Sequence, residues 1–497
     1  MKPTSPPVRP ARAEFLRKFF DFSRLPVDYD WKVEPARRVY VIRNLRMDDI
    51  SAIGFDMDYT LAIYHKREIE QLAFDLSLKK LVEDWKYPEE VLRVRYDPEA
   101  VIRGLVIDRR HGNFLKMDQF HVVSRVQHGK RALGAEQRKE LYHNRKIRLG
   151  QERYFSVDTL FGLPEGSLYQ ELVEFADANP QLVSPDYERI YDDVRGALDM
   201  VHRDNSLKSQ ILADPERYIY RDPRLPATLE KFLKGGKKLF VLTNSEWYFT
   251  EAVMGFLLDG QIDYMPRWTD YFDAVGVEAS KPSFFLTDAP LMPVPEAQIP
   301  GVRAFRKGSV APFEELLGTR SERVLFIGDH IYGDILRSKK HCNWRTVMII
   351  EEMEHEIEAD RKARPVLREI ERFLRRIERH DFKRNLLQMK LAMLEQTYED
   401  APGESVGGEL EFQRVSLASL EQKVAEMHAR LAELEGELER QYNASWGPLF
   451  RAASEISRFG HQVQGYACLY TGRVSNFLAY PFNKFFQSPR ERMPHDL

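Results

Sequence analysis

The 497-residue chain has very little cysteine, no long apolar run and almost no net charge. Its only cysteines are Cys342 and Cys468, so neither a disulfide framework nor a thiolate metal site is expected. No stretch of about 18 apolar residues is present to span a bilayer. The basic start MKPTSPPVRPARAEF is not followed by the apolar segment of a secretory signal. We therefore expect a cytoplasmic protein with no membrane partner.

The charge balance excludes partners that are held mainly by electrostatics. Lys and Arg number 74 and Asp and Glu number 77, which gives a net charge of −3. This balance provides no overall attraction to nucleic acid or to an anionic membrane surface, so a nucleic-acid partner is not expected. Hydrophobic residues at 43% and charged residues at 30% are typical of a globular protein.

Strand and helix patterns alternate between about residues 225 and 350. The helix pattern ATLEKFLKGG precedes the strand pattern KKLFVLTNS, and the helix pattern WYFTEAVMGFLL follows it. Two further strand patterns, RVLFIGDH and NWRTVMII, complete the series, and residues 37–45 and 51–58 also resemble buried strands. This rhythm predicts an α/β fold with a doubly wound, parallel, Rossmann-like sheet.

The other segments indicate four regions. Residues 1–39 are predicted to form an N-terminal arm, and residues 40–66 with 222–350 the core domain. Residues 67–221, which begin with a helical pattern over 67–85 but show no regular alternation, are predicted to be a mixed α+β insertion between the two parts of the core. Residues 351–497 are predicted to be a helical extension packed outside the core.

The extension contains a coiled-coil pattern in its segment 410–440. A Gly-rich break at 401–408 separates this segment from a helix at about 366–398, so the two can pair as an antiparallel hairpin. The pattern also favours self-association as a dimer or tetramer. Apolar residues follow a 3,4 spacing at Leu417, Leu420, Val424, Met427, Leu431, Leu434 and Leu438.

The strongest chemical signal is FDMDYTLAIY at 55–64, where an apolar strand ends in Asp56 and Asp58. Open α/β sheets bind ligands at the carboxyl ends of their strands. An isolated pair of this kind is weak evidence, because acidic pairs often simply begin a turn.

Three more segments with polar side chains lie at strand ends or loop starts. They are TNS at 243–245, the lysine of SKP at 281, and GDHIYGD at 328–334. Each has an ordinary alternative: a helix cap, a solvated loop lysine, and a turn. Four such segments in this order are much harder to explain as coincidence.

This order resembles the four-motif signature of the haloacid dehalogenase superfamily. The resemblance implies that residues 40–66 and 222–350 have that superfamily's core fold, and that residues 67–221 are its inserted cap domain, which determines substrate specificity. It also implies phosphoryl transfer through an aspartyl phosphate. It implies that Asp56 is the nucleophile, Asp58 the general acid and then base, Thr243 a hydrogen-bond donor to the phosphoryl group, and Lys281 the cation that neutralises their charge.

The same resemblance implies a bound Mg²⁺. Its ligands would be the carboxylates of Asp56 and Asp329 and the backbone carbonyl of Asp58, with Asp334 supporting them. Oxygen ligands suit Mg²⁺. A carboxylate attacks a dianionic phosphate only when cations screen the repulsion, so Mg²⁺ and Lys281 are needed together.

Longer motifs are similar to the cytosolic purine 5′-nucleotidases that prefer IMP and GMP. They include DTLFGLPE (158–165), DDVRGALDMVHRDNSLK (192–208), LTNSEWYF (242–249) and SWGPLFRAASEISRFGHQVQGYACLY (445–470). The resemblance implies hydrolysis of purine nucleoside monophosphates, and the captured phosphoryl group could also pass to a second nucleoside. The motifs do not distinguish IMP, GMP and their deoxy forms. The substrate contacts that the resemblance implies are Phe161, Arg195, Asp199, His202, Lys208, Asn244 and Ser245.

Other interpretations are open for these residues and for the whole chain. Arg195, Asp199 and His202 share one helical face by spacing, which is also typical of a solvated face with an Arg–Asp pair. A phosphatase for another phosphoester, and a nucleotide-sensing scaffold, are the alternatives to a 5′-nucleotidase. A scaffold would be free to lose catalytic residues, and all of them are present here.

Overall fold

The computed structural model describes residues 33–143, 147–297, 303–400 and 404–490. Most of the predicted N-terminal arm lies outside these ranges. The chain divides into two compact units, the first containing residues up to Glu354 and from Leu449 onward, and the second containing His355–Pro448. No helix within the described ranges is both long and apolar enough to cross a bilayer.

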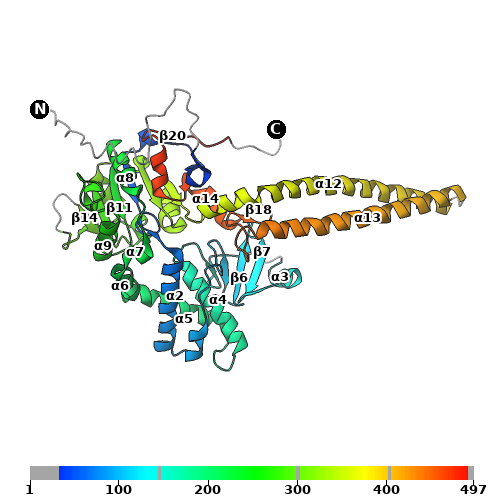
Figure 1. The fold of residues 1–497 in the computed structure, drawn as a ribbon, viewed down its shortest axis with the longest axis horizontal. Helices are drawn as coiled ribbons and strands as arrows, with labels where there is room; N and C mark the ends of the chain where they lie inside the picture. Colours follow the sequence, from blue (N-terminus) through cyan, green and yellow to red (C-terminus); the bar gives the residue numbers. More distant parts are fainter. Residues whose placement is uncertain (1–32, 144–146, 298–302, 401–403, 491–497) are drawn as a thin grey trace. The chain divides into compact units, whose positions relative to one another are not determined.

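A nine-stranded sheet forms the centre of the first unit (Figure 1). Its inner strands are parallel, and the two edge strands β1 and β13 run antiparallel to their neighbours, which confirms the α/β class. In spatial order the strands are β1 (Tyr40–Val41), β19 (Leu469–Thr471), β16 (Arg345–Ile349), β15 (Val324–Gly328), β3 (Ala52–Phe55), β11 (Lys238–Leu242), β12 (Ala274–Val277), β14 (Ala304–Arg306) and β13 (Met292–Pro293).

The central strand β3 is AIGF and is buried along its whole length. A strand covered on both faces reads as a continuous apolar run rather than an alternating one. Its partners β11 and β15 are apolar for the same reason. The helices that alternate with the strands of this sheet along the chain are α8 (Leu225–Lys234), α9 (Trp247–Leu258), α10 (Val310–Leu317), α11 (Arg337–Cys342) and α14 (Arg458–Tyr466).

Residues 67–221 contain helices and a separate antiparallel sheet, and their two ends are joined by the pairing of β4 (Ile63–Tyr64) with β10 (Ile219–Tyr220). The five strands of that sheet are β8 (Arg131–Ala132), β7 (Val123–His128), β6 (Asn113–Met117), β5 (Val106–Asp108) and β9 (Tyr154–Ser156). The helices are α2 (Lys66–Glu83), α3 (Ala135–Tyr142), α4 (Gly162–Ala178), α5 (Tyr187–Arg203), α6 (Ser206–Ala213) and α7 (Pro215–Tyr218).

The C-terminal segment differs from the predicted helical extension. Residues from Leu449 onward belong to the first unit, where β19 inserts between β1 and β16, and β20 (Phe485–Phe486) pairs with β2 (Leu45–Arg46). Two- and three-residue strands are too short to show the alternation that separates a strand from a helix in a sequence. The prediction of an outer helical extension is therefore wrong for this part of the chain.

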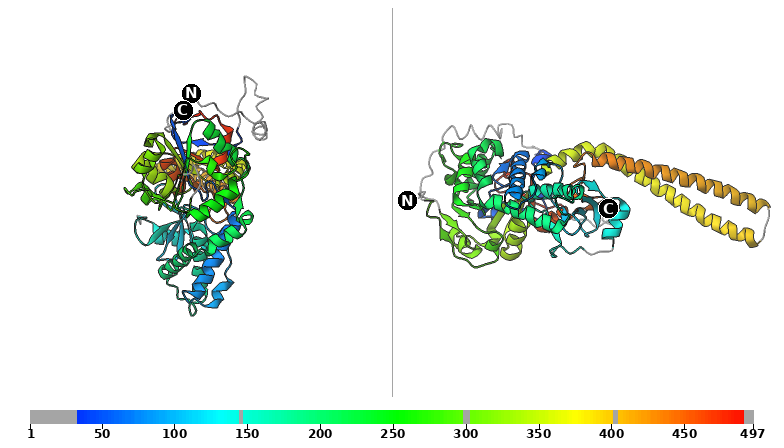
Figure 2. Two further views of the ribbon diagram at one scale, coloured as in Figure 1. Left: turned by 90° about the vertical axis from the view of Figure 1, so that its left-hand side faces the viewer. Right: turned by 90° about the horizontal axis from the view of Figure 1, so that it is seen from below.

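The second unit is a hairpin of two long helices, α12 (Met353–Asp400) and α13 (Glu404–Glu439), which Figures 1 and 2 show running side by side. The predicted break at 401–408 is shorter, because α13 already begins at Glu404; residues 401–403 lie outside the described ranges. Both helices contribute to the apolar seam between them. It contains Ile370, Ile377, Leu431 and Leu434, with Val366, Phe373, Met427 and Leu438 packed against them.

We expect Gly54→Ala to destabilise the central sheet. A Cβ atom on Gly54 would lie 2.2 Å from ring carbons of Phe240 and 2.8 Å from Phe326, so both rings would have to move. Overpacking of this kind costs about 1–3 kcal/mol. Denaturant unfolding of the purified protein measures this loss.

Gly465→Ala is the matched control, because a Cβ atom there meets nothing within 4 Å and the residue lies in helix α14. Alanine in a helix is favoured over glycine by up to about 1 kcal/mol. The control should leave the free energy of unfolding unchanged or raise it. Equal losses in the two variants would contradict the account of the β3 packing.

Candidate active site

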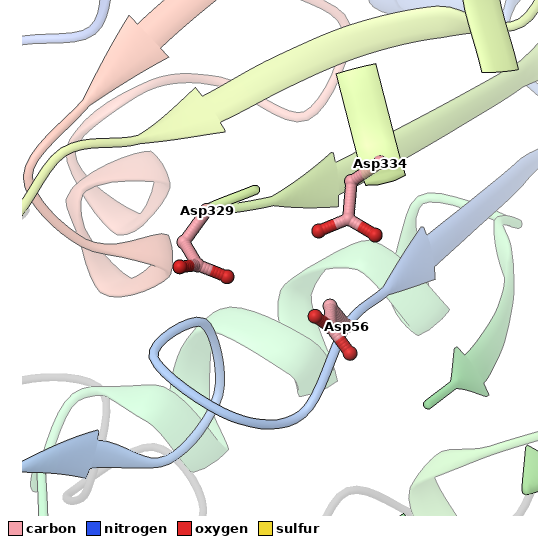
Figure 3. A group of neighbouring side chains, drawn as sticks. All are labelled: Asp56, Asp329 and Asp334. Atoms are coloured by element: carbon pink, nitrogen blue, oxygen red, sulfur yellow. The ribbon is translucent and has the colours of Figure 1, made fainter. Parts of the chain in front are cut away.

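Three carboxylates meet where strands β3 and β15 end. Asp56 follows β3, and its backbone N–H donates to the Ile327 carbonyl oxygen of β15 at 2.9 Å. Asp329 follows β15 directly, and Asp334 lies one helical turn farther along. Figure 3 shows the three side chains facing one another, and one oxygen of each lies within 4.8 Å of the others. Because β3 and β15 are parallel neighbours, their carboxyl ends bring these residues together although they lie far apart in the sequence.

Lys281 is the cation of this cluster. Its Nζ lies 2.9 Å from Asp56 Oδ1 and 2.7 Å from Asp334 Oδ1, and its side chain is only 4% exposed. Burial favours the neutral amine, but the two carboxylates outweigh burial and raise the pKa of Lys281 above its ordinary value. The lysine is therefore charged.

The three carboxylates outnumber the one lysine that contacts them. Burial, and then the carboxylate of Asp334, raise the pKa of Asp56 to about 6 against the opposing effect of Lys281. Burial and the charges of Asp56 and Asp334 raise the pKa of Asp329 well above its usual range. Asp329 Oδ2 is buried and has no hydrogen-bond partner among the described residues. A buried, unpartnered carboxylate oxygen beside two others fits a hard divalent cation.

Asp58 is held by two hydroxyl groups. Tyr64 donates to its Oδ1 at 2.6 Å, and Ser245 donates to its Oδ2 at 2.8 Å. Burial, followed by the charge of Asp56, raises the pKa of Asp58. Ser245, predicted as a substrate contact, is thus placed to orient Asp58.

The TNS segment follows β11 and organises its surroundings. Thr243 is buried, and its hydroxyl accepts from the backbone N–H of Ser245 at 3.1 Å. The Asn244 side chain accepts from the Lys281 N–H at 2.6 Å and donates to the Lys281 carbonyl oxygen at 3.1 Å. Asn244 thereby holds the peptide that carries Lys281, and its contact with substrate stays a prediction.

A cavity of about 280 Å³ extends from the carboxylates toward the inserted segment. Phe161 packs edge-on against Tyr59, with ring centroids 4.8 Å apart, and against His202 at 5.9 Å. Phe161 is 40% exposed, so one part of its ring is free for a ligand. All predicted catalytic and metal-binding residues line this cavity, as do Phe161, His202, Lys208, Asn244 and Ser245.

Arg195 and Asp199 do not belong to the described cavity lining. The Arg195 guanidinium lies 3.6 Å from Glu165 Oε1 and 4.7 Å above the Phe155 ring, and Asp199 is exposed. Arg195 and His202 share a helical face, but seven residues separate them by about 10 Å along the axis. Only the end of α5 that carries His202 reaches the cavity. The geometry therefore gives the base-reading role of Arg195 and Asp199 no support.

Several cavity residues carried no signal in the sequence. They come from apolar helix faces or from positions inside a motif, where a core role is the ordinary expectation. Glu70 is the most unusual, because it is 2% exposed, accepts a hydrogen bond from Tyr96, and has a pKa that burial raises to about 7. The set includes Tyr59, Tyr64, Glu70, Leu207, Phe249 and His330.

Arg103 is a further residue that the sequence did not indicate. It comes from the inserted segment, and its side chain is fully buried. Its guanidinium donates to both oxygens of the Glu352 carboxylate, and Nη1 donates to the Asp329 carbonyl oxygen at 3.2 Å. Arg103 thereby connects the inserted segment to the loop that presents the Asp329 carboxylate.

The chain is similar to known proteins along most of its length. Residues 39–497 match the model of the 5′ nucleotidase family. A 5′-nucleotidase domain-containing protein from Dictyostelium discoideum is 29% identical over 497 residues, which cover 97% of this chain and 77% of the relative. A solved structure, a predicted phosphoglycolate phosphatase from Haemophilus somnus, is 15% identical with a TM-score of 0.25, over 61% of this chain and 85% of that one.

We expect Arg103→Lys to weaken the binding of a divalent cation at the carboxylates. Lysine keeps the charge but loses the two-point contact with Glu352 and the bond to the Asp329 carbonyl oxygen. Residues that orient metal ligands typically contribute 10- to 100-fold to affinity. Isothermal titration of the nucleotide-free protein with Mg²⁺ or Mn²⁺ measures this change.

Arg473→Lys is the control, because Arg473 makes a similar two-point contact with Glu354, at 2.7 and 3.0 Å, two residues from Glu352. It has no described contact with Asp329. Equal cation affinities in the two variants would show that Arg103 does not act on the Asp329 loop.

Proposed function

Because the chain belongs to the 5′ nucleotidase family, we propose that it hydrolyses purine nucleoside 5′-monophosphates, with Mg²⁺ bound and Asp56 as a covalent nucleophile. Family membership over residues 39–497 establishes a phosphoric monoester hydrolase that acts on nucleoside monophosphates. The purine preference, the metal and the covalent intermediate are the proposed part. The observation that carries the proposal is the contact of Lys281 with Asp56 beside two further buried carboxylates.

Asp56 is suited to attack phosphorus. One of its oxygens contacts Lys281 and also accepts from the Met57 N–H at 2.8 Å, which leaves the second oxygen for substrate or cation. A cation held by Asp56 and Asp329, with Asp334 in support, would supply positive charge for the phosphoryl oxygens. Attack forms a bond between an Asp56 carboxylate oxygen and phosphorus, which gives an acyl phosphate, and breaks the bond from phosphorus to the nucleoside oxygen.

Asp58 handles the proton in both steps. When protonated, it donates to the departing nucleoside oxygen; as a carboxylate, it then takes a proton from the water that cleaves the phospho-aspartate and releases phosphate. Its raised pKa favours the protonated form needed first. Hydroxyl groups can donate or accept, so Tyr64 and Ser245 can remain bonded to Asp58 in both forms.

The nucleoside part of the substrate is proposed to lie against Phe161 and His202. Both rings line the cavity, and the exposed part of Phe161 offers an apolar surface for a base. Burial, and then the charge of Lys208, lower the pKa of His202, so its ring is neutral near pH 7 and can donate or accept. A large flat purine covers more of the Phe161 ring than a pyrimidine does, which supports the proposed preference for IMP or GMP.

Asp56→Asn tests the covalent mechanism. The amide has almost the same shape but is not nucleophilic, so we expect phosphate release from IMP and GMP to fall by about 10⁴-fold or more while nucleotide binding persists. A panel of purine and pyrimidine monophosphates with Mg²⁺, and with EDTA in its place, measures preference and metal dependence together. Substantial turnover in Asp56→Asn would exclude the aspartyl phosphate. Equal rates for purines and pyrimidines would exclude the purine preference alone.

Phe161→Ala tests the base contact. Loss of a stacked base costs about 1–3 kcal/mol, so kcat/KM for IMP or GMP should fall roughly 5- to 150-fold. Hydrolysis of p-nitrophenyl phosphate, which reaches only the carboxylates, should stay near the wild-type rate. Phe120→Ala is the control, because it removes a ring that is 70% exposed and outside the described cavity lining. It should leave the hydrolysis of both substrates at the wild-type rate. Equal losses on both substrates would show that Phe161 only stabilises the inserted segment.

A further inference from the structure

Helix α12 carries an apolar stripe that does not face α13. Phe382, Leu386, Met389 and Met393 follow a 4,3,4 spacing, and 66%, 49%, 65% and 70% of their surfaces are exposed. At about 100° per residue this spacing places the four side chains within about 60° of one another around the helix. It is the spacing by which one helix packs along another.

The stripe is separate from the seam that joins the two helices of the hairpin. At the level of the stripe, α12 turns its half-buried residues Leu387, Leu391 and Leu394 inward. The stripe lies about 130° away from them around the helix. A hairpin of two helices needs one apolar face on each helix, so a second exposed face indicates another helical partner.

Helix α13 has a matching feature. Phe412 and Val415 are 65% and 61% exposed, whereas the intervening Gln413 is only 7% exposed. Around the helix, Phe412 and Val415 lie about 100° and 160° from Gln413, a mean of about 130°. This rotation has the same sense as the rotation of the α12 stripe away from its seam. In an antiparallel pair, equal rotation in the same sense places both sets on the same broad face of the hairpin.

Cross-helix ion pairs align the two sets in height. Lys390 pairs with Glu409, and Arg414 pairs with Glu395, each at 2.7 Å. Phe412 and Val415 therefore lie level with the end of the α12 stripe. We call the combined surface the tip patch: Phe382, Leu386, Met389, Met393, Phe412 and Val415. Six such side chains expose on the order of 600 Å², which is at the upper end for the largest patch of a monomer.

The charges of the two helices identify the partner. Residues 364–390 of α12 contain nine Lys or Arg and four Asp or Glu, whereas residues 414–439 of α13, which the ion pairs place at the same level, contain six Glu and three Lys or Arg. A second hairpin that placed α12 on α12 would bring two basic surfaces together. Placing α12 of one copy on α13 of the other brings basic and acidic surfaces together twice.

We propose that the tip patch is the site where two copies of this chain associate. A two-fold axis parallel to the hairpins stacks the patches, sets α12 of each copy antiparallel to α13 of the other, and leaves both tips at the same end. The product is a four-helix bundle with opposite charges across each new contact. Because Phe412 and Val415 lie level with Met389 and Met393, the apolar residues of the two copies meet at the same height.

Met389→Glu/Met393→Glu tests the proposal. Both side chains are exposed in the single chain, so the substitutions leave its fold intact, but in the pair they would face the acidic α13 of the partner. Light scattering coupled to size exclusion should give wild-type protein at least twice the chain mass of 58.3 kDa. The double variant should have half the wild-type mass, with a dissociation constant at least 100-fold higher by sedimentation equilibrium.

Leu367→Glu/Leu374→Glu is the matched control, since it adds the same charges at exposed leucines of α12 that lie outside the tip patch. Its mass should equal that of wild type. A monomeric wild type at tens of micromolar, or a double variant that keeps the wild-type mass, would overturn the proposal.

Cysteine cross-linking tests the arrangement independently. Cys342 and Cys468 are buried, so an added surface cysteine is the reactive one. A mixture of Met393→Cys and Phe412→Cys proteins should form an intermolecular disulfide far more readily than either protein alone. Preferential cross-linking of Met393→Cys with itself would place α12 on α12 and overturn the proposed pairing.

Discussion

The ion pairs of Lys281 with Asp56 and Asp334 are the constraint on which the rest of the site depends. Three buried carboxylates and one buried ammonium leave a formal charge of −2 at the carboxyl ends of β3 and β15. A buried charge of this size is unstable unless protons or a cation neutralise it, which is why the pKa of Asp329 is raised so strongly. One divalent ion would balance the cluster and leave Asp56 ionised, as a nucleophile must be.

Residues around the site fix the positions of Lys281 and of the carboxylates. The Asn244 side chain is hydrogen-bonded to both the N–H and the carbonyl oxygen of Lys281. The Asp56 N–H donates to the Ile327 carbonyl oxygen. Arg103 donates to the carbonyl oxygen of Asp329. Each of these comes from a different stretch of the chain. The inserted segment therefore does more than cover the cavity, because Arg103 makes the position of a carboxylate at the sheet edge depend on that segment.

The convergence of the carboxylates could be predicted from the sequence, because parallel strands bring their carboxyl ends to one edge of the sheet, whatever lies between them along the chain. A motif at a strand end is located by that rule alone, and Asp56, Thr243, Lys281 and Asp329 all follow it. Helix faces are less predictable. Spacing placed Arg195 and His202 on one face of α5, but it could not say which end of that face meets the cavity. Arg103 and Glu70 were missed because a buried charge in an irregular or amphipathic stretch has no periodic signature. The three-residue strand β19 was missed because it is too short to show alternation.

In the hairpin, the apolar spacing of a helix does not reveal whether the apolar face is buried or exposed. The heptad residues of α13 could be recognised because their apolar spacing repeats along the helix. They pack against Ile370 and Ile377 of α12 in the seam. The stripe from Phe382 to Met393 has the same spacing, but a sequence alone does not separate a buried stripe from an exposed one. The structure of the hairpin shows that α13 already covers the inner apolar face of α12. An apolar face that remains exposed after the chain has folded is then evidence about association rather than about folding, because burying it requires a second molecule.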